Sequence, residues 1–285
     1  MAHRLPGRRR AVRRGGAVRR PVIRWRPRAA AALALASAAG LAAFGWPLLT
    51  DAGSGVAHAQ DAPWLFALLL PMLIAVVLAE IADGGMDAKA VALLGVLAAV
   101  GAALRPLGGG AAGLEPVFFL LVLAGRALGA GFGFVLGAVT MFASALLTGG
   151  VGPWLPFQML AAAWMGFLAG CLPRACGRGE LVLLAGYGML AGLVYGLLLN
   201  LSSWPYLTGL STSLSYVPGA PVPENLRRLF AFTLATSLGF DIPRGLLTAT
   251  VILMAGRPIL LALRRAARRA AFETEPEFET RAEAG

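Results

Sequence analysis

Four polar residues, Arg105, Glu115, Gln158 and Asn200, stand at or near the ends of long apolar segments. Arg105 ends one such segment and Glu115 opens the next, while Gln158 follows a turn rich in glycine and proline. A few polar groups around an apolar pocket fix the orientation of a mostly apolar ligand. This set therefore predicts non-covalent binding of a small molecule.

Three aromatic residues are expected at the same depth as these polar groups. Trp154 lies in the turn before Gln158, and Trp204 and Tyr206 follow the segment that Asn200 ends. Aromatic rings at that depth either line a ligand pocket or form the belt that membrane proteins place at the lipid–water interface. The sequence leaves both interpretations open.

Asp241 and Arg244 form a second charged candidate, near the middle of the last apolar segment and with Pro243 between them. Their spacing puts them on one helix face, where pairing limits the cost of burying charge in lipid. A charge at that depth is a functional candidate by default. A structural ion pair explains the two residues as well, and we favour that interpretation.

Several chemistries are excluded by missing motifs. The chain has no Gly-x4-Gly-Lys-Ser/Thr loop for ATP, no Ser/His/Asp set, no HExxH motif and no row of intramembrane acids. Two cysteines and two histidines, Cys171, Cys176, His3 and His58, make no four-ligand zinc set. We therefore expect no catalytic residue, no metal and no cofactor, and energy supplied by a partner.

The composition places these residues in a membrane protein. Apolar residues make up 58% of the chain, charged residues make up 14%, and the mean hydropathy is +0.73. A soluble domain would expose far more charge. Most of the apolar segments have the roughly 17–25 residues that a crossing helix needs. They lie at about 29–49, 64–83, 88–104, 115–126, 128–148, 156–172, 180–200 and 228–256. We predict an all-α polytopic membrane protein.

The short segment 115–126 decides the orientation. If it crosses, nearly all the arginines between segments lie on one side, and the other side keeps only Arg105, Arg227 and Arg228. If it does not cross, the basic cluster after residue 256 moves outside, against the positive-inside bias. We therefore predict eight crossings, with both termini in the cytoplasm.

The two ends differ in charge from the predicted core, residues 85–265. Residues 1–28 carry eleven arginines and no acid, which is typical of a cytoplasmic tail near anionic lipid more than of a nucleic-acid arm. Residues 29–84 hold two additional transmembrane helices. The first is favoured as an uncleaved signal anchor, although the small-residue site at 57–59 leaves a cleaved signal peptide open. Residues 266–285, which end in an acidic stretch, are predicted as a disordered cytoplasmic tail.

Two stripes of small residues predict close helix packing in lipid. The first recurs every fourth residue from Gly125 to Gly137, and we expect it to pack within the protein. The second comprises Ala88, Ala92, Gly95 and Ala99. It either packs internally or docks another membrane protein, and the sequence does not decide between the two.

The stretch from Ala88 to Leu263 resembles the substrate-binding membrane subunit (S component) of energy-coupling factor (ECF) transporters, most of all the actinobacterial members. The resemblance rests on EPVFFLLVLAGR at Glu115–Arg126, ALGAGFGFVLG at Ala127–Gly137, LLTGGVGPWLPFQMLAAAWMGFLAG at Leu146–Gly170 and SLGFDIPRGLLTA at Ser237–Ala249. It implies a six-helix core with both ends in the cytoplasm. The two additional helices and the basic tail depart from this pattern, so the use of a shared or a dedicated coupling module stays open.

The resemblance also implies a function. Such subunits bind a vitamin in a pocket near the outer face, capped here by loops 105–113, 149–155 and 202–225. A face with small residues four apart, matched by Ala88 and Ala92, docks on a transmembrane coupling subunit, and two ATPase subunits drive the cycle. We therefore expect a substrate-binding subunit of an importer in the cell membrane.

The expected substrate is a micronutrient, with a corrinoid such as cobalamin as the first candidate, because the last outer loop is large and aromatic and the pocket carries little charge. Two other classes stay open: a stand-alone carrier or channel for a small organic solute, and a membrane scaffold or lipid-modifying protein. An enzyme would have only Arg105, Glu115 and the Asp241–Arg244 pair as reactive groups at one depth. Nucleic acid is not an expected partner.

Overall fold

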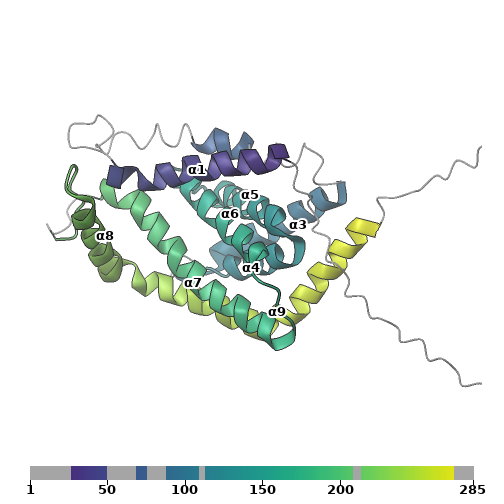
Figure 1. Ribbon diagram of the computed structural model, residues 1–285. Helices are drawn as coiled ribbons and strands as arrows, with labels where there is room; N and C mark the ends of the chain where they lie inside the picture. Colours follow the sequence, from purple (N-terminus) through teal and green to yellow (C-terminus); the bar gives the residue numbers. More distant parts are fainter. Residues whose placement is uncertain (1–26, 50–68, 76–87, 109–112, 208–212, 273–285) are drawn as a thin grey trace, which may run out of the picture.

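The computed structural model describes residues 27–49, 69–75, 88–108, 113–207 and 213–272, and within these ranges the regular elements are helices (Figure 1). The α-helices are α1 (Pro27–Leu49), α3 (Ala88–Leu104), α4 (Val117–Leu128), α5 (Ala130–Thr148), α6 (Leu155–Cys171), α7 (Gly177–Ser203), α8 (Val222–Thr236) and α9 (Leu238–Phe272). Short 3-10 turns, η3 (Arg105–Gly108) and η5 (Trp204–Tyr206), follow α3 and α7.

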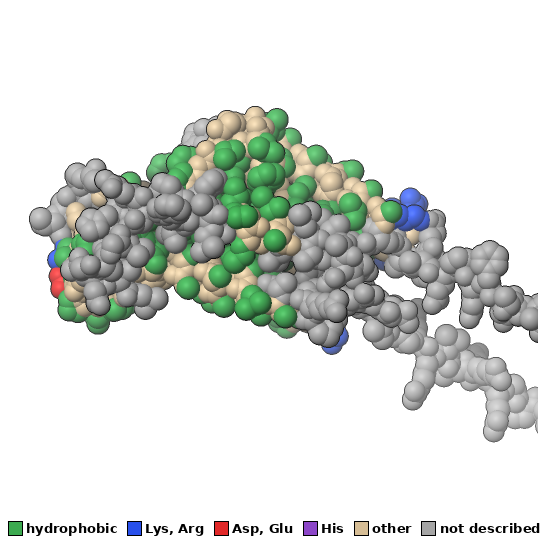
Figure 2. All heavy atoms as spheres, turned by 90° about the horizontal axis from the view of Figure 1, so that it is seen from above, with side chains coloured by type: hydrophobic (Ala, Val, Ile, Leu, Met, Phe, Trp, Pro, Cys, Tyr) green, Lys and Arg blue, Asp and Glu red, His purple; other side chains and the backbone are tan. Residues whose placement is uncertain are grey.

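Four helical stretches in the described residues are long and apolar enough to cross a membrane: Ala88–Gly108, Ala130–Thr148, Gly177–Tyr206 and Leu238–Arg269. Shorter apolar helices lie at Leu33–Leu48, Val117–Leu128 and Leu155–Cys171. Figure 2 shows, for the described residues, charged side chains toward the two ends of the molecule and an apolar band between them. The chain is an all-α polytopic membrane protein, as the composition predicts.

The predicted segments 29–49, 88–104, 128–148 and 156–172 agree with α1, α3, α5 and α6 to within two residues at each end. Of the second predicted N-terminal crossing, 64–83, the structure describes residues 69–75, which are helical. Residues 1–26, the small-residue site at 57–59, the loop centres 109–112 and 208–212, and the acidic end 273–285 lie outside the described residues.

The last predicted segment, 228–256, is wrong as a single helix. Helix α8 begins at Val222, inside the predicted outer loop, and ends at Thr236, and α9 then runs from Leu238 to Phe272. Pro223 sits in the first turn of α8, where its missing N–H costs nothing. Residues 266–272, predicted as the start of a disordered tail, continue α9. Asp241 and Arg244 consequently lie near the start of α9, not near the middle of the last helix.

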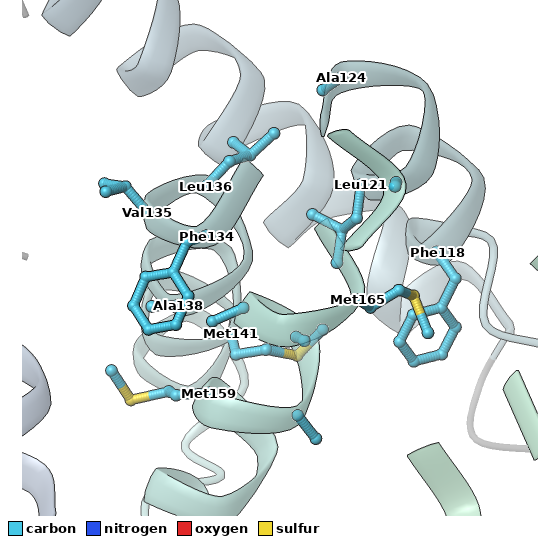
Figure 3. Packing of buried hydrophobic residues seen from close by; sticks show 14 of the residues in the cluster. Phe118, Leu121, Ala124, Phe134, Val135, Leu136, Ala138, Met141, Met159 and Met165 are labelled. Carbon is cyan, nitrogen blue, oxygen red and sulfur yellow. The ribbon is translucent and has the colours of Figure 1, made fainter. Parts of the chain in front are cut away.

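Helix α4 is the centre of the bundle. It contacts α5, α6, α7 and α9, and apolar residues on all its sides are buried, as expected for a helix with no lipid-facing side. Figure 3 shows Phe118 and Leu121 of α4 in the same core as Met141 of α5 and Met165 of α6. A short helix is sufficient in this position because its neighbours, not lipid, cover it.

The glycine stripe lets α5 and α6 approach to backbone contact. A Cβ on Gly166 of α6 would lie 2.2 Å from the carbonyl oxygen of Gly133, and a Cβ on Gly133 would lie 2.3 Å from that of Gly166. A Cβ on Gly137 would lie 2.3 Å from the carbonyl oxygen of Ala162. The prediction that this stripe packs within the protein is confirmed.

Candidate functional site

Arg244 is the centre of a buried charge network at the start of α9. Its Nε donates to Glu115 Oε2 at 2.8 Å, and its Nη1 donates to Asp241 Oδ1. The guanidinium carbon also lies 5.4 Å from the ring centre of Tyr195 and 5.8 Å from that of Phe118. Two carboxylates and two aromatic faces thus stabilise one cation, which joins α9 to α4 and α7.

Backbone glycines make room for this network. Gly113, at φ 73°, turns the chain against α9, and a Cβ there would lie 1.9 Å from the carbonyl oxygen of Phe240. Glu115 follows, with its N–H bonded to the carbonyl oxygen of Gly113 at 2.9 Å. On α7, a Cβ on Gly196 would overlap the carboxylate of Asp241. These approaches place both carboxylates beside Arg244.

The second oxygen of Asp241, Oδ2, is buried and has no hydrogen-bond partner among the described residues. A buried carboxylate oxygen without a donor is costly, so the network retains an unused acceptor. The structure therefore leaves hydrogen-bonding capacity at Asp241 that a donor from outside the network could use.

Arg105 and Gln158, predicted at one depth from distant parts of the sequence, are in contact. Arg105 Nη2 donates to Gln158 Oε1 at 2.9 Å, which joins η3 to the first turn of α6. No described carboxylate lies within ion-pair distance of Arg105. Arg105 therefore brings an uncompensated positive charge to the same end of the bundle.

The described contacts of Asn200 are with α8 and with Ser237, which follows α8. Its amide nitrogen donates to Ser237 Oγ at 2.6 Å and to Thr233 Oγ1 at 3.2 Å. Ser237 Oγ is also 2.9 Å from the amide oxygen of Asn200. Asn200 thus ties α7 to the junction between α8 and α9.

The three predicted aromatic residues are not gathered around the charge network. Trp154 is 52% exposed and its Nε1 donates to the carbonyl oxygen of Gly150 in its own turn, at 3.2 Å. Trp204 is fully buried and donates to the carbonyl oxygen of Leu214 at 2.6 Å. Tyr206 packs on Trp46 of α1 at 5.8 Å between ring centres. Of these rings, only Trp154 has the exposure of an interfacial residue.

A second ion network, which the sequence analysis missed, lies at the opposite end of α4 and α7. Glu180 Oε1 accepts from Arg126 Nε at 2.8 Å and from Arg264 Nη2 at 2.6 Å. Arg126 also donates to the carbonyl oxygens of Leu172 and Pro173, at 2.8 and 3.1 Å. The available signal in the sequence was Glu180, an acid that lies near Arg174 and Arg178 at the start of an apolar segment.

The two networks show that α4 connects the two ends of the bundle. Glu115 precedes α4 and contacts Arg244, whereas Arg126 in its last turn shares Glu180 with Arg264. Arg244 and Arg264 are twenty residues apart on α9, about 30 Å of helix, which is the thickness of a hydrocarbon core. The 12 residues of α4 reach only about 18 Å, so the long side chains of Arg126 and Arg244 complete the connection. The crossing by segment 115–126 stays a prediction.

The small-residue face of α3 does not pack internally in the described structure. Ala88, Ala92, Gly95 and Ala99 are all exposed, and a Cβ on Gly95 would have no neighbour within 4 Å. The buried face of α3 is the opposite one, made by Ala90, Leu94, Leu97, Ala98, Gly101 and Ala102. Within the described residues, no other helix covers this stripe.

A family model described as "ECF transporter, substrate-specific component" matches residues 89–256. No curated protein and no solved structure matches the chain. The matched region runs from α3 into α9 and includes the network around Arg244. Of the second network it includes Arg126 and Glu180, whereas Arg264 follows the matched region. Because this match covers more than half of the chain, the protein belongs to the family of substrate-specific components of ECF transporters.

Proposed function

We propose that this chain captures a micronutrient without covalent chemistry at the end that carries Arg105 and Arg244, and that this end faces the cell exterior. The observation that supports the proposal is the convergence of η3, α4, α6, α7 and α9 on these two cations inside the family-matched region. Substrate-specific components work with a membrane coupling component and ATPases, so the energy comes from those partners.

The polar groups at this end that lack a partner in the described chain indicate which chemical groups a ligand should carry. Arg105 offers a cation without a carboxylate partner in the described chain, and Asp241 offers a buried acceptor oxygen. A ligand with both an acceptor or anionic group and an N–H or O–H donor would use both, and its apolar body would supply most of the buried area. A corrinoid such as cobalamin, with amide groups around a large ring, fits and is the first compound to test.

We further propose that the exposed face of α3 docks on the coupling subunit. Replacing Ala92→Leu adds a bulky side chain to a face on which close backbone approach depends on small residues. Uptake in cells is expected to fall at least about tenfold, the equivalent of 1.4 kcal/mol of lost docking, while binding by the purified chain stays at the wild-type level. Radiolabelled uptake and binding assays separate the two.

The matched control is Ala38→Leu, a substitution of the same size at an exposed position of α1. It should leave both uptake and binding unchanged. If Ala92→Leu transported as well as Ala38→Leu does, the docking face would be elsewhere.

The orientation can be tested with thiols at the two ends of α6. Cys171 is exposed at the end of this helix and Cys176 is exposed in the turn that follows, whereas the exposed Trp154 precedes its first turn. In a Trp154→Cys variant that also carries Cys171→Ser and Cys176→Ser, the introduced thiol should react with a membrane-impermeant maleimide in intact cells.

The wild-type chain is the control, because its two native thiols should react only after the cells are permeabilised. The opposite pattern, with native thiols labelled from outside and position 154 protected, would place the proposed site in the cytoplasm and rule out capture from the exterior.

A further inference from the structure

Helix α1 lies outside the family-matched region but is built into the bundle. Trp164 of α6 donates from Nε1 to Ser37 Oγ at 3.0 Å. Phe44 is buried between the rings of Phe157 and Trp164, at 5.0 and 5.8 Å between centres. A Cβ on Gly40 would overlap the side chain of Leu160, so α1 approaches α6 closely there. In Figure 1, α1 lies across the bundle, and it contacts α6, α7 and α8.

The C-terminal end of α1 reaches two chain segments that follow α7. Trp46 packs on Tyr206 at 5.8 Å and on Tyr216 at 6.4 Å between ring centres. Tyr216 in turn packs edge-on against Trp204 at 5.3 Å. We name residues 204–207 and 213–217, which stand before and after residues 208–212 in the sequence, the two flanking segments.

The flanking segments have further ties to the protein. Trp204 donates to the carbonyl oxygen of Leu214, which joins one flank to the other. The side chain of Asn225, in the first turn of α8, bonds to both the N–H and the carbonyl oxygen of Val217, at 3.2 and 2.8 Å. Trp46 connects α1 to both flanking segments through its ring contacts with Tyr206 and Tyr216.

We propose that α1 is an integral part of the capture unit and that Trp46 is the positioning residue through which it holds the two flanking segments in place. The inference does not depend on the substrate, because it follows from packing alone. It gives a role to a helix that the family match does not include: α1 keeps residues 204–207 and 213–217 against the bundle, at the end opposite Glu180.

The nature of the contact makes the proposal testable with a conservative variant. Trp46 is 6% exposed, and its Nε1 has no hydrogen-bond partner in the described part of the chain. The contact therefore acts through ring packing, which phenylalanine can largely reproduce and alanine cannot. Loss of two aromatic pairs should raise roughly tenfold the equilibrium constant for detachment of the flanking segments from α1.

The experiment is hydrogen exchange, read by mass spectrometry, on the full chain in lipid nanodiscs. With Trp46→Ala, peptides that report the flanking segments should exchange about tenfold faster, while peptides from α5 and α6 stay at the wild-type rate. Useful reporters are the amides of Leu207, bonded to the carbonyl oxygen of Trp204, and Val217, bonded to Asn225. Trp46→Phe should stay close to wild type.

Two further variants complete the test. Leu41→Ala removes an exposed side chain of α1 and should change nothing. Tyr216→Leu removes one of the two rings that Trp46 contacts and should speed exchange in the flanking segments by itself. Adding Trp46→Ala should then have a smaller effect than it has in the wild-type chain, because only the contact with Tyr206 remains to be lost. Unchanged exchange at the flanks in Trp46→Ala, an equal rise in α5 and α6, or exchange in Trp46→Phe as fast as in Trp46→Ala would overturn the proposal.

Discussion

Replacing Arg244→Met is expected to lower the free energy of unfolding by about 3–5 kcal/mol, the usual cost of removing one partner from a buried ion network. Arg244 is the shared cation of Asp241 and Glu115, whose side chains are 4% and 19% exposed. Methionine keeps much of the volume but leaves two like charges near each other in a poorly solvated position. Capture of the native compound should be lost as well.

The effect can be measured as the unfolding free energy in mixed micelles titrated with a denaturing detergent. Arg228→Met is the control, since Arg228 pairs with Glu224 at the surface of α8, where such a pair is worth less than about 1 kcal/mol. Adding Glu115→Gln and Asp241→Asn to Arg244→Met should recover part of the lost stability, because the uncompensated charges are then gone. Equal losses in Arg244→Met and Arg228→Met would contradict the charge network.

Replacing Gly166→Ala is expected to cost about 3 kcal/mol, the upper end for overpacking, although it adds a single methyl group. The added Cβ would lie 2.2 Å from the carbonyl oxygen of Gly133, and backbone on both sides leaves no flexible side chain that could move away. Helices α5 and α6 would have to separate, and the core around α4 would lose its packing.

The matched control is Gly186→Ala, which adds the same methyl group at an exposed position of α7. A Cβ there has no neighbouring atom within 4 Å. That variant should be neutral or slightly more stable, because alanine restricts the unfolded chain more than glycine does. The same detergent titration measures both variants. If Gly166→Ala is as stable as Gly186→Ala, backbone contact does not hold α5 and α6 together.

Most helix positions could be predicted because glycine, proline or arginine interrupts the apolar runs at their ends, as at Gly149 after α5 and Pro173 after α6. The break between α8 and α9 could not. Apolar residues lie on both sides of Ser237, so hydropathy continues through it, and the bond from Asn200 that fixes this junction comes from another helix. The residues next to Ser237 in the sequence do not predict a hydrogen bond from a different helix.

In the candidate site, too, features set by local sequence could be predicted, whereas contacts between helices could not. The Asp241–Arg244 pair follows from spacing within one helix, and Arg105 and Gln158 were expected at one depth, although their mutual contact was not. Glu115 as the second partner of Arg244 depends on how α4 packs against α9, which no local pattern reports. Glu180 was missed for a related reason, since its two arginines come from helices far apart in the sequence.

The central claim, capture of a small molecule at the Arg105 end, is tested most directly by native mass spectrometry of the full chain purified from its membranes. Wild type and Ala92→Leu should carry the same compound at one copy per chain, because docking and capture use different surfaces. Arg105→Met should carry none, since it removes the cation that lacks a carboxylate partner in the described chain. A wild-type chain without any bound compound, or Arg105→Met with wild-type occupancy, would contradict the account.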